Sequence, residues 1–332
     1  MINNNIILYF CENRKKMTHQ EILLSTIRRL LPKNISLNDE IAKVLDISYD
    51  AAHRRISLKS KFSIEETILL CKHYALSMDT LYKKQENILI EKTKKIESMT
   101  DFKSYFEKTR EILSYLNPKE TIIYYAAKDI PMNYAVAGTL FSKFKFYIWL
   151  TLLKKKQNVH FEEFLFESYL INDDSYLKSF FDNTNRIEIW NDTTINSSLQ
   201  QIFYFFESGL LNYKNAIIIL NDINLIIKNI EQKCETNSSN FQIFYNELLI
   251  LNNSVLFYSK EKSVFFLPYN ALGYYATSDK DACEEQQEYI INQLSNSKSL
   301  NQSGKKNRKI FFNKMYQKID FYIAKIENYV IE

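Results

Sequence analysis

Three residues that can bind an anion stand side by side in the stretch ISYDAAHRRISLKSKFS, residues 47–63. His53, Arg54 and Arg55 are consecutive in a chain with only 4 histidines, and Lys59 and Lys61 follow closely. An arginine can donate two parallel hydrogen bonds to a phosphate or to the edge of guanine, whereas a lysine attracts phosphate as a point charge. The cluster therefore indicates either a solvated basic helix face or a surface suited to phosphate.

The spacing of the small and apolar residues predicts which of these side chains face outward. If Ala52 and Ile56 face the core at i, i+4 spacing, the outward face carries Tyr49, Asp50, His53, Arg54 and Ser57. In a recognition helix the N-terminal half contacts base edges, and basic residues nearby hold phosphates. The predicted base contacts are Tyr49, Asp50, His53 and Arg54. The predicted phosphate contacts are Arg55, Lys59 and Lys61, together with the hydroxyl or the helix-end N–H of Ser48.

The segment before this helix has the features that would position it. SLNDEIAKVLDIS, residues 36–48, predicts a helix capped by Ser36 or Asn38, with the small residue Ala42 where a second helix could cross closely. Residues 46–48 form the predicted turn, and Ile47 could fill its corner. This pattern is typical of a helix-turn-helix.

The surrounding residues predict a compact all-helical domain over residues 17–84. The helix THQEILLSTIRRLL ends at Pro32, and Ser63 with Glu66 forms a capping-box pattern before the next helix. About five helices fit into this span. Residues 1–16 are predicted to be a disordered extension or to lie upstream of the natural start, and residues 85–100 a charged linker.

The segment LNDEIAKVLDISYDAAHRRISLKSKFSIEETILLCKHYALSMDTLY resembles the five-helix DNA-binding domain of the lambda repressor and Cro type. It is especially similar to the variant found in large transcriptional regulators of Bacteroidetes bacteria, and YYAAKDIPMNY and NRIEIWNDTTINSSLQQIFYFFESGLL resemble segments that follow that domain. The resemblance implies double-stranded DNA as partner and a C-terminal part that senses a ligand or forms a dimer. The chain departs from the pattern at Asp46, where glycine is usual, and at Arg55, near a position that is often apolar.

Residues 101–332 predict a larger α+β domain that is mostly helical. Strands are predicted at 120–127 and 185–190, and three more within 248–269, from β-branched and aromatic content. The predicted helices span 136–156, 161–181, 197–211, 215–234, 282–294 and 305–330. The last of these has heptad-like spacing for about two and a half heptads, which favours packing on its own domain over a coiled coil.

Several patterns argue against an enzyme, a cofactor or a metal. With only 4 glycines the chain contains no GxGxxG or P-loop motif, and its 4 cysteines form no CxxC pair. His160 is the only histidine of the large domain, which excludes a multi-histidine site there. The remaining candidates favour surface or core roles: the acid pairs at 173–174 and 284–285, Lys128 beside Asp129, the basic stretch SGKKNRK at 303–309, and the aromatic clusters with Trp149 and Trp190.

Charge and hydropathy indicate the expected partner and location of the protein. Residues 1–85 hold 14 Lys and Arg against 9 Asp and Glu, a balance of +5 within a total of +4. The longest apolar run, FYIWLTLL, is too short to span a membrane, so a cytoplasmic protein is expected. We expect a homodimeric bacterial transcription regulator that binds specific DNA, with a small-molecule effector as a further partner. The alternative is a protein-interaction or scaffold module whose helical domain docks a protein.

Overall fold

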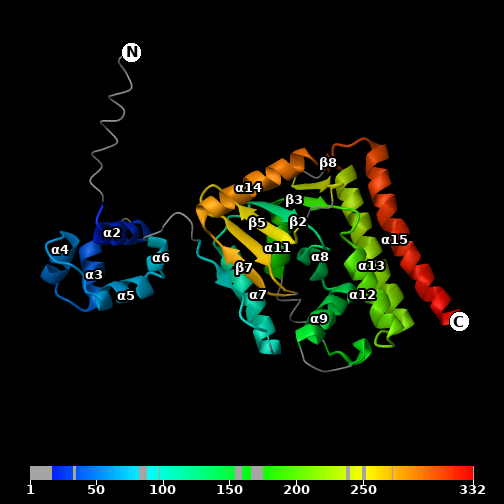
Figure 1. Ribbon diagram of the computed structural model, residues 1–332, viewed down its shortest axis with the longest axis horizontal. Helices are drawn as coiled ribbons and strands as arrows, with labels where there is room; N and C mark the ends of the chain where they lie inside the picture. The colour runs from blue at the N-terminus through cyan, green and yellow to red at the C-terminus, as the bar shows by residue number, and fades with distance from the viewer. Residues whose placement is uncertain are drawn as a thin grey trace, which may run out of the picture. The chain divides into compact units, whose positions relative to one another are not determined.

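The computed structural model describes residues 17–32, 35–81, 88–96, 98–153, 159–165, 175–236, 240–248, 252–270 and 272–331 (Figure 1). It divides into two compact units, Met1–Leu89 and Ile90–Glu332. The predicted extension, residues 1–16, lies outside the described residues. The predicted linker extends too far, because β1 (Glu91–Lys92) pairs with the sheet of the second unit and Ile96 is buried in its core.

The described part of the N-terminal unit is built from short helices with polar caps. These are α2 (His19–Leu30), α3 (Leu37–Leu45), α4 (Tyr49–Ile56), α5 (Ile64–His73) and α6 (Met78–Leu81). Ser63 and Glu66 form a capping box at α5, as their spacing predicts, and Thr18 with Glu21 forms another at α2. Residues at helical spacing fill one core, including Ile27, Ile41, Ala52 and Leu70, each fully buried.

Two helices of this unit, α3 and α5, end at a residue with left-handed backbone geometry that is not glycine. Asp46, with φ 51°, closes α3, and Ala75, with φ 52°, follows α5. The next residue in each case caps the helix C-terminus. The Ile47 N–H donates to the Ala42 carbonyl of α3, and the Leu76 N–H donates to the Cys71 carbonyl of α5. A glycine would adopt this backbone with less strain.

The C-terminal unit is organised around one mixed sheet of eight strands, in the order β1-β7-β6-β5-β2-β3-β4-β8. The strands are β2 (Ile122–Ala126), β3 (Asn185–Trp190), β4 (Phe241–Tyr245), β5 (Ser254–Tyr258), β6 (Val264–Pro268), β7 (Tyr274–Thr277) and β8 (Lys298–Ser299), with β1 at one edge. Strands β2, β3 and β4 are parallel neighbours, and all other pairs are antiparallel.

The predicted fold class, an all-α helix-turn-helix domain followed by a mostly helical α+β domain, is therefore wrong. The large mixed sheet dominates the second unit, and helical segments connect its parallel strands. The sequence interpretation gave the helices too much weight because β4 and β7, of five and four residues, were not recognised as strands. Of the three strands predicted within 248–269, β5 and β6 lie there, whereas residues 249–251, where the first was expected, lie outside the described residues.

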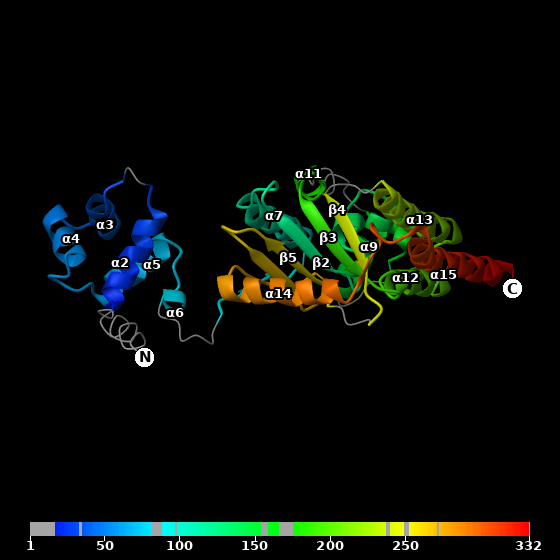
Figure 2. The same cartoon turned by 90° about the horizontal axis from the view of Figure 1, so that it is seen from above.

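Helices cover both faces of the sheet (Figures 1 and 2). On one face, Cys283 and Ile290 of α14 (Lys280–Ser295) pack on Tyr124 and Leu256. The other face carries the larger cores and the remaining helices: α7 (Met99–Ser114), α8 (Met132–Ala135), α9 (Leu140–Leu153), α11 (Ser175–Asn183), α12 (Asn196–Glu207), α13 (Tyr213–Glu235) and α15 (Lys305–Ile331). Because both faces are covered, β2 is apolar or aromatic at every position.

Of two longer predicted helices, the structure contains the first only in part and confirms the second. The prediction over 161–181 is only partly met, since a 3-10 turn spans Phe161–Glu163, α11 begins at Ser175, and 166–174 lie outside the described residues. Helix α15 packs along α13 and α12 within its own unit. Its residues Phe312, Met315, Ile319 and Ile326 are fully buried, which confirms the prediction that this spacing serves the domain core.

Candidate nucleic-acid interface

Helices α3 and α4 are joined by a three-residue turn, Asp46–Ser48. Ser36 is the N-cap residue of α3, which decides between the two predicted caps, although its side chain makes no capping bond. Ser48 caps α4, and its Oγ accepts a hydrogen bond of 3.3 Å from the Ala51 N–H. Because the hydroxyl of Ser48 is used in this way, an anion at the start of α4 would meet backbone N–H groups.

The two faces of α4 differ sharply in exposure. Ala52 is fully buried and Ile56 packs against the core, as their spacing predicts. The exposed side chains are those of Tyr49, Asp50, His53, Arg54 and Ser57, and the segment that follows α4 exposes Lys59 and Lys61. The helix therefore presents a continuous polar face with one acidic and several basic groups.

Asn38, from α3, holds two of the predicted base contacts. Its Nδ2 lies 3.0 Å from the Tyr49 hydroxyl and 3.2 Å from the His53 Nδ1. The first contact is a hydrogen bond donated by the amide, and the second requires His53 Nδ1 to be the unprotonated ring nitrogen. One side chain on the first helix thus orients two on the second. The sequence interpretation considered Asn38 only as a cap and missed this role.

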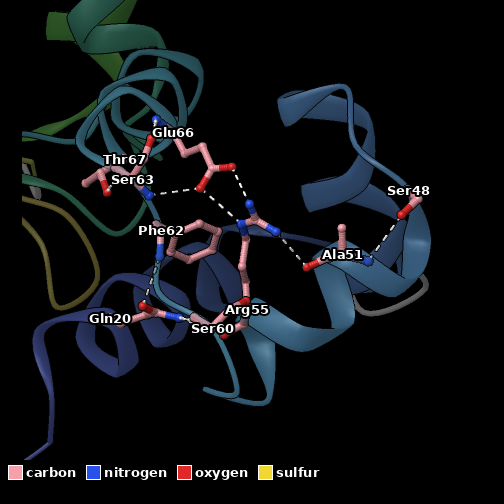
Figure 3. Close-up of polar contacts among 9 residues, drawn as sticks. All are labelled: Gln20, Ser48, Ala51, Arg55, Ser60, Phe62, Ser63, Glu66 and Thr67. Atoms are coloured by element: carbon pink, nitrogen blue, oxygen red, sulfur yellow. Dashed lines mark hydrogen bonds and ion pairs between the residues drawn. The ribbon is translucent and has the colours of Figure 1, made fainter.

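Arg55 does not belong to the exposed face (Figure 3). Its Nε and Nη2 donate to the two carboxylate oxygens of Glu66, at 3.0 and 2.6 Å, and its Nη1 donates to the Ala51 carbonyl at 3.0 Å. Its side chain is only 21% exposed. The predicted phosphate contact is therefore corrected, because an arginine with every nitrogen engaged inside the domain is a brace between α4 and α5.

The carboxylate of Glu66 makes two kinds of stabilising contact. In addition to the Arg55 pair, its Oε2 accepts a hydrogen bond from the Ser63 N–H at 2.9 Å, which completes the capping box of α5 (Figure 3). The hydrogen bond from Arg55 outweighs partial burial and holds the pKa of Glu66 below its ordinary value. The departure at Arg55 from the usual apolar residue was the sequence signal for this pair.

Gln20, on α2, fixes the segment that carries the exposed lysines (Figure 3). Its Nε2 donates to the carbonyls of Arg55 and Ser60 at 2.7 and 2.9 Å, and its Oε1 accepts from the Phe62 N–H at 3.2 Å. These three bonds hold the backbone between α4 and α5. Lys59 and Lys61 are therefore presented from a fixed backbone, and nothing in the spacing of Gln20 predicted this.

Of the remaining candidate residues, some are exposed and others are engaged within the fold. Lys128 is exposed, whereas Asp129 pairs with Lys145 at 3.0 Å. In the basic stretch, Arg308 is buried and bonds the Leu300 carbonyl, and a Cβ on Gly304 would meet no atom within 4 Å. His160 and the pair at 284–285 are exposed, Trp190 is buried, and the pair at 173–174 lies outside the described residues.

Comparisons with family models, with curated proteins and with solved structures give no match to this chain. In the described part of the chain, no helix is long and apolar enough to cross a membrane. Nor do three His, Cys, Asp or Glu side chains gather there as ligands for a metal ion. The candidate interface therefore rests on the geometry of the N-terminal unit.

Proposed function

We propose that this chain is a sequence-specific DNA-binding regulator that reads the major groove with α4, as a helix-turn-helix protein. The observation that carries the proposal is the exposed face of α4, on which His53 and Arg54 project from a helix whose opposite face, at Ala52, is fully buried. The resemblance of this segment to the lambda repressor and Cro type agrees with the proposal. The C-terminal unit then serves as the sensing or dimerising part.

Five of the exposed side chains have distinct roles in the proposed complex. Arg54 donates two hydrogen bonds to guanine, while Tyr49 and His53, both held by Asn38, contact neighbouring base edges. Lys59 and Lys61 attract phosphates of the flanking backbone, and the first N–H groups of α4 meet another. Two copies would place their α4 helices in successive major grooves, on half-sites about one helical turn apart.

Selection from random genomic DNA fragments, followed by sequencing of the retained pool, tests this proposal. We expect an enriched two-fold symmetric motif for the unaltered protein. Arg54→Ala should lose discrimination of about 1–3 kcal/mol at one base pair of each half-site. Lys59→Ala with Lys61→Ala should weaken binding to all sequences and lower the slope of log affinity against log salt by about 2.

A matched control removes the same charge elsewhere. Lys305 and Lys306 are exposed on the C-terminal unit, so Lys305→Ala with Lys306→Ala changes the net charge equally. This pair should leave the selected motif and its affinity unchanged. Absence of an enriched motif, or equal loss in both double variants, would contradict the proposed interface.

A protein-interaction module is the second candidate, and one observation favours it. Helix α5 exposes apolar side chains on its surface, with Ile64 73%, Ile68 40% and Leu69 50% exposed. Such residues suit contact with another protein better than contact with DNA. Salt distinguishes the two functions, because binding through phosphates falls steeply between low and moderate salt, whereas an apolar contact does not.

A further inference from the structure

A cavity of about 1010 Å³ lies within the C-terminal unit. It is bounded by the sheet, through residues such as Tyr125 and Phe257, and by helices α7, α8, α9 and α13. Its walls are rich in aromatic side chains, including Tyr105, Phe106, Trp149 and Tyr274. This size is at the upper end of the range for small-molecule sites, and the lining suits an apolar ligand.

Two basic side chains on the cavity wall are almost completely buried, and their partners differ. Lys145 is 2% exposed, and its Nζ donates to Asp129, Ser198 and Gln201 at 3.0, 3.1 and 3.2 Å. An ammonium group has three hydrogens, so these three acceptors satisfy it. Lys145 is therefore a structural group that fixes the loop after β2, and it has no hydrogen left for a ligand.

Arg186, near the start of β3, is 4% exposed and is less well satisfied. Its ion-pair partner is Glu188, whose Oε1 lies 2.9 Å from Nε without the alignment of a hydrogen bond. Asp182 adds a further electrostatic attraction, and the Tyr134 hydroxyl is a hydrogen-bond partner of the guanidinium. Glu188 already accepts hydrogen bonds from the Tyr134 hydroxyl at 3.0 Å and the Trp190 Nε1 at 2.8 Å. A guanidinium with five donors thus shares one carboxylate with two other donors.

The surroundings of Arg186 leave its edge as the part that can take a ligand. Its Cζ lies 5.6 Å from the centroid of the Tyr134 ring and 5.0 Å from that of Phe241, so aromatic rings approach the guanidinium. Two amide oxygens on the same cavity wall, those of Asn133 and Asn253, are also buried without a hydrogen-bond partner among the described residues. A cavity wall with several unmet polar groups is a feature of a binding site, because such groups are costly to bury unpaired.

We propose that this cavity binds an amphipathic organic acid, with its carboxylate on Arg186 and its apolar body among the aromatic side chains. Arginine matches a carboxylate in a two-point geometry, and the Arg186 side chain is only 4% exposed, so the charge-assisted contact would be strong. Three acidic side chains, Asp129, Asp182 and Asp222, balance the three basic ones on the wall, Lys145, Arg186 and Lys233. The wall therefore lacks the excess of positive charge that a phosphate would need, and a single carboxylate is the better match to Arg186.

The site goes beyond the proposed DNA-binding function and does not depend on it. A fluorescent probe of the right chemistry, dansylaminoundecanoic acid, can be titrated into the full chain in parallel with its primary amide, which has the same body but no charge. We expect the acid to bind at least about tenfold more tightly than the amide, since the charge-assisted contact with Arg186 is worth more than about 1.4 kcal/mol. Equal affinities, or no binding of either probe, would overturn the proposal without any variant.

Variants locate the site. Arg186→Gln should weaken the acid about tenfold and leave the amide unchanged, and Arg186→Lys should retain part of the preference for the acid. Lys228→Gln, on an exposed position of α13 outside the cavity wall, is the control and should alter neither. Val136→Phe, which adds bulk to the wall, should weaken both probes. If the Arg186 variants fail to fold, by circular dichroism, Val136→Phe and the acid–amide pair still decide the question.

Failure of this site and failure of the proposed function are separable. DNA affinity is measured on the same samples with and without the acid probe. Retained DNA binding with no preference for the acid would refute the cavity proposal alone. Preference for the acid, lost in Arg186→Gln, with no DNA binding would support the cavity proposal and refute the regulator.

Discussion

Each unit contains an arginine–glutamate pair, and the two pairs are built differently. In the N-terminal unit, Arg55 has Glu66 at two nitrogens and a backbone carbonyl at the third. In the C-terminal unit, Arg186 lies against Oε1 of Glu188, which also accepts a hydrogen bond from the Tyr134 hydroxyl, while Oε2 accepts one from the Trp190 Nε1. The first pair is a two-point contact in which every guanidinium nitrogen is engaged, whereas the second is a one-point contact whose Nε lacks an aligned hydrogen bond.

The difference shows that the function of an arginine depends on its remaining hydrogen-bonding capacity as well as on its burial. Arg55 stands in a basic cluster and suggests a phosphate contact, yet it braces two helices. Arg186 stands in a strand that alternates charged and isoleucine residues and suggests an exposed face, yet it lies beside a cavity. The hydrogen bonds that each guanidinium makes within the fold distinguish the structural arginine from the candidate ligand-binding one.

The largest effect is expected from breaking the C-terminal pair. Glu188→Ala leaves Arg186 charged and buried, and removes the acceptor of Tyr134 and Trp190, so it should lower the free energy of unfolding by about 3–5 kcal/mol. Both tryptophans of the chain, Trp149 and Trp190, lie in this unit, so tryptophan fluorescence during urea denaturation reports on it. A loss below about 1 kcal/mol would show that the pair matters little to the fold.

A smaller effect is expected for the N-terminal pair. In a double-mutant cycle with Arg55→Ala and Glu66→Ala, the coupling energy should be about 1–3 kcal/mol, because two charge-assisted hydrogen bonds are lost together. Amide hydrogen exchange in α4 and α5 measures the stability of this unit separately. Additive single-variant effects would mean that the contact contributes no coupling.

The stability of the N-terminal unit should depend on pH through the carboxylate of Glu66. Because the pKa of Glu66 is lowered in the folded state, its contribution is present above the ordinary value of 4.5 and is lost as the pH falls through the lowered value. Exchange protection of α4 and α5 should therefore decrease on acidification. In Glu66→Gln this decrease should be weaker; an identical acid profile would assign it to other carboxylates.

The smallest effect concerns how helices end in the two units. Helix α12 is followed by Gly209, with φ 73°, whereas α5 is followed by Ala75 at φ 52°. Ala75→Gly should stabilise the N-terminal unit by about 0.5–1 kcal/mol, because glycine adopts the left-handed region without strain. Gly209→Ala should destabilise the C-terminal unit by a similar amount. Exchange rates and urea denaturation, respectively, measure the two changes.

Local signals account for what the sequence predicted correctly. Ser63 with Glu66 marks the start of α5, and the β-branched run at 185–190 marks β3, because a cap or a strand propensity depends on neighbours in sequence. The pairing of β4 with β3 and β8 involves residues far apart in the chain, and β4 itself is only five residues long. The exposed face of α4 followed from helical spacing, while the interactions of Arg55 and Gln20 depend on tertiary contacts.

The short edge strand β1 connects a residue of the cavity wall to the part of the C-terminal unit that comes first in the sequence. Thr93, which follows β1, exchanges hydrogen bonds with Tyr274, since its N–H donates to the Tyr274 carbonyl at 3.0 Å and its Oγ1 accepts from the Tyr274 N–H at 2.9 Å. Tyr274 also lines the cavity, and Thr93 lies four residues after the boundary between the units. A ligand that displaces Tyr274 would therefore also disturb its hydrogen bonds with Thr93. If binding at the two units is coupled in this way, thermodynamic reciprocity requires that DNA alter the affinity for the organic acid by the same factor.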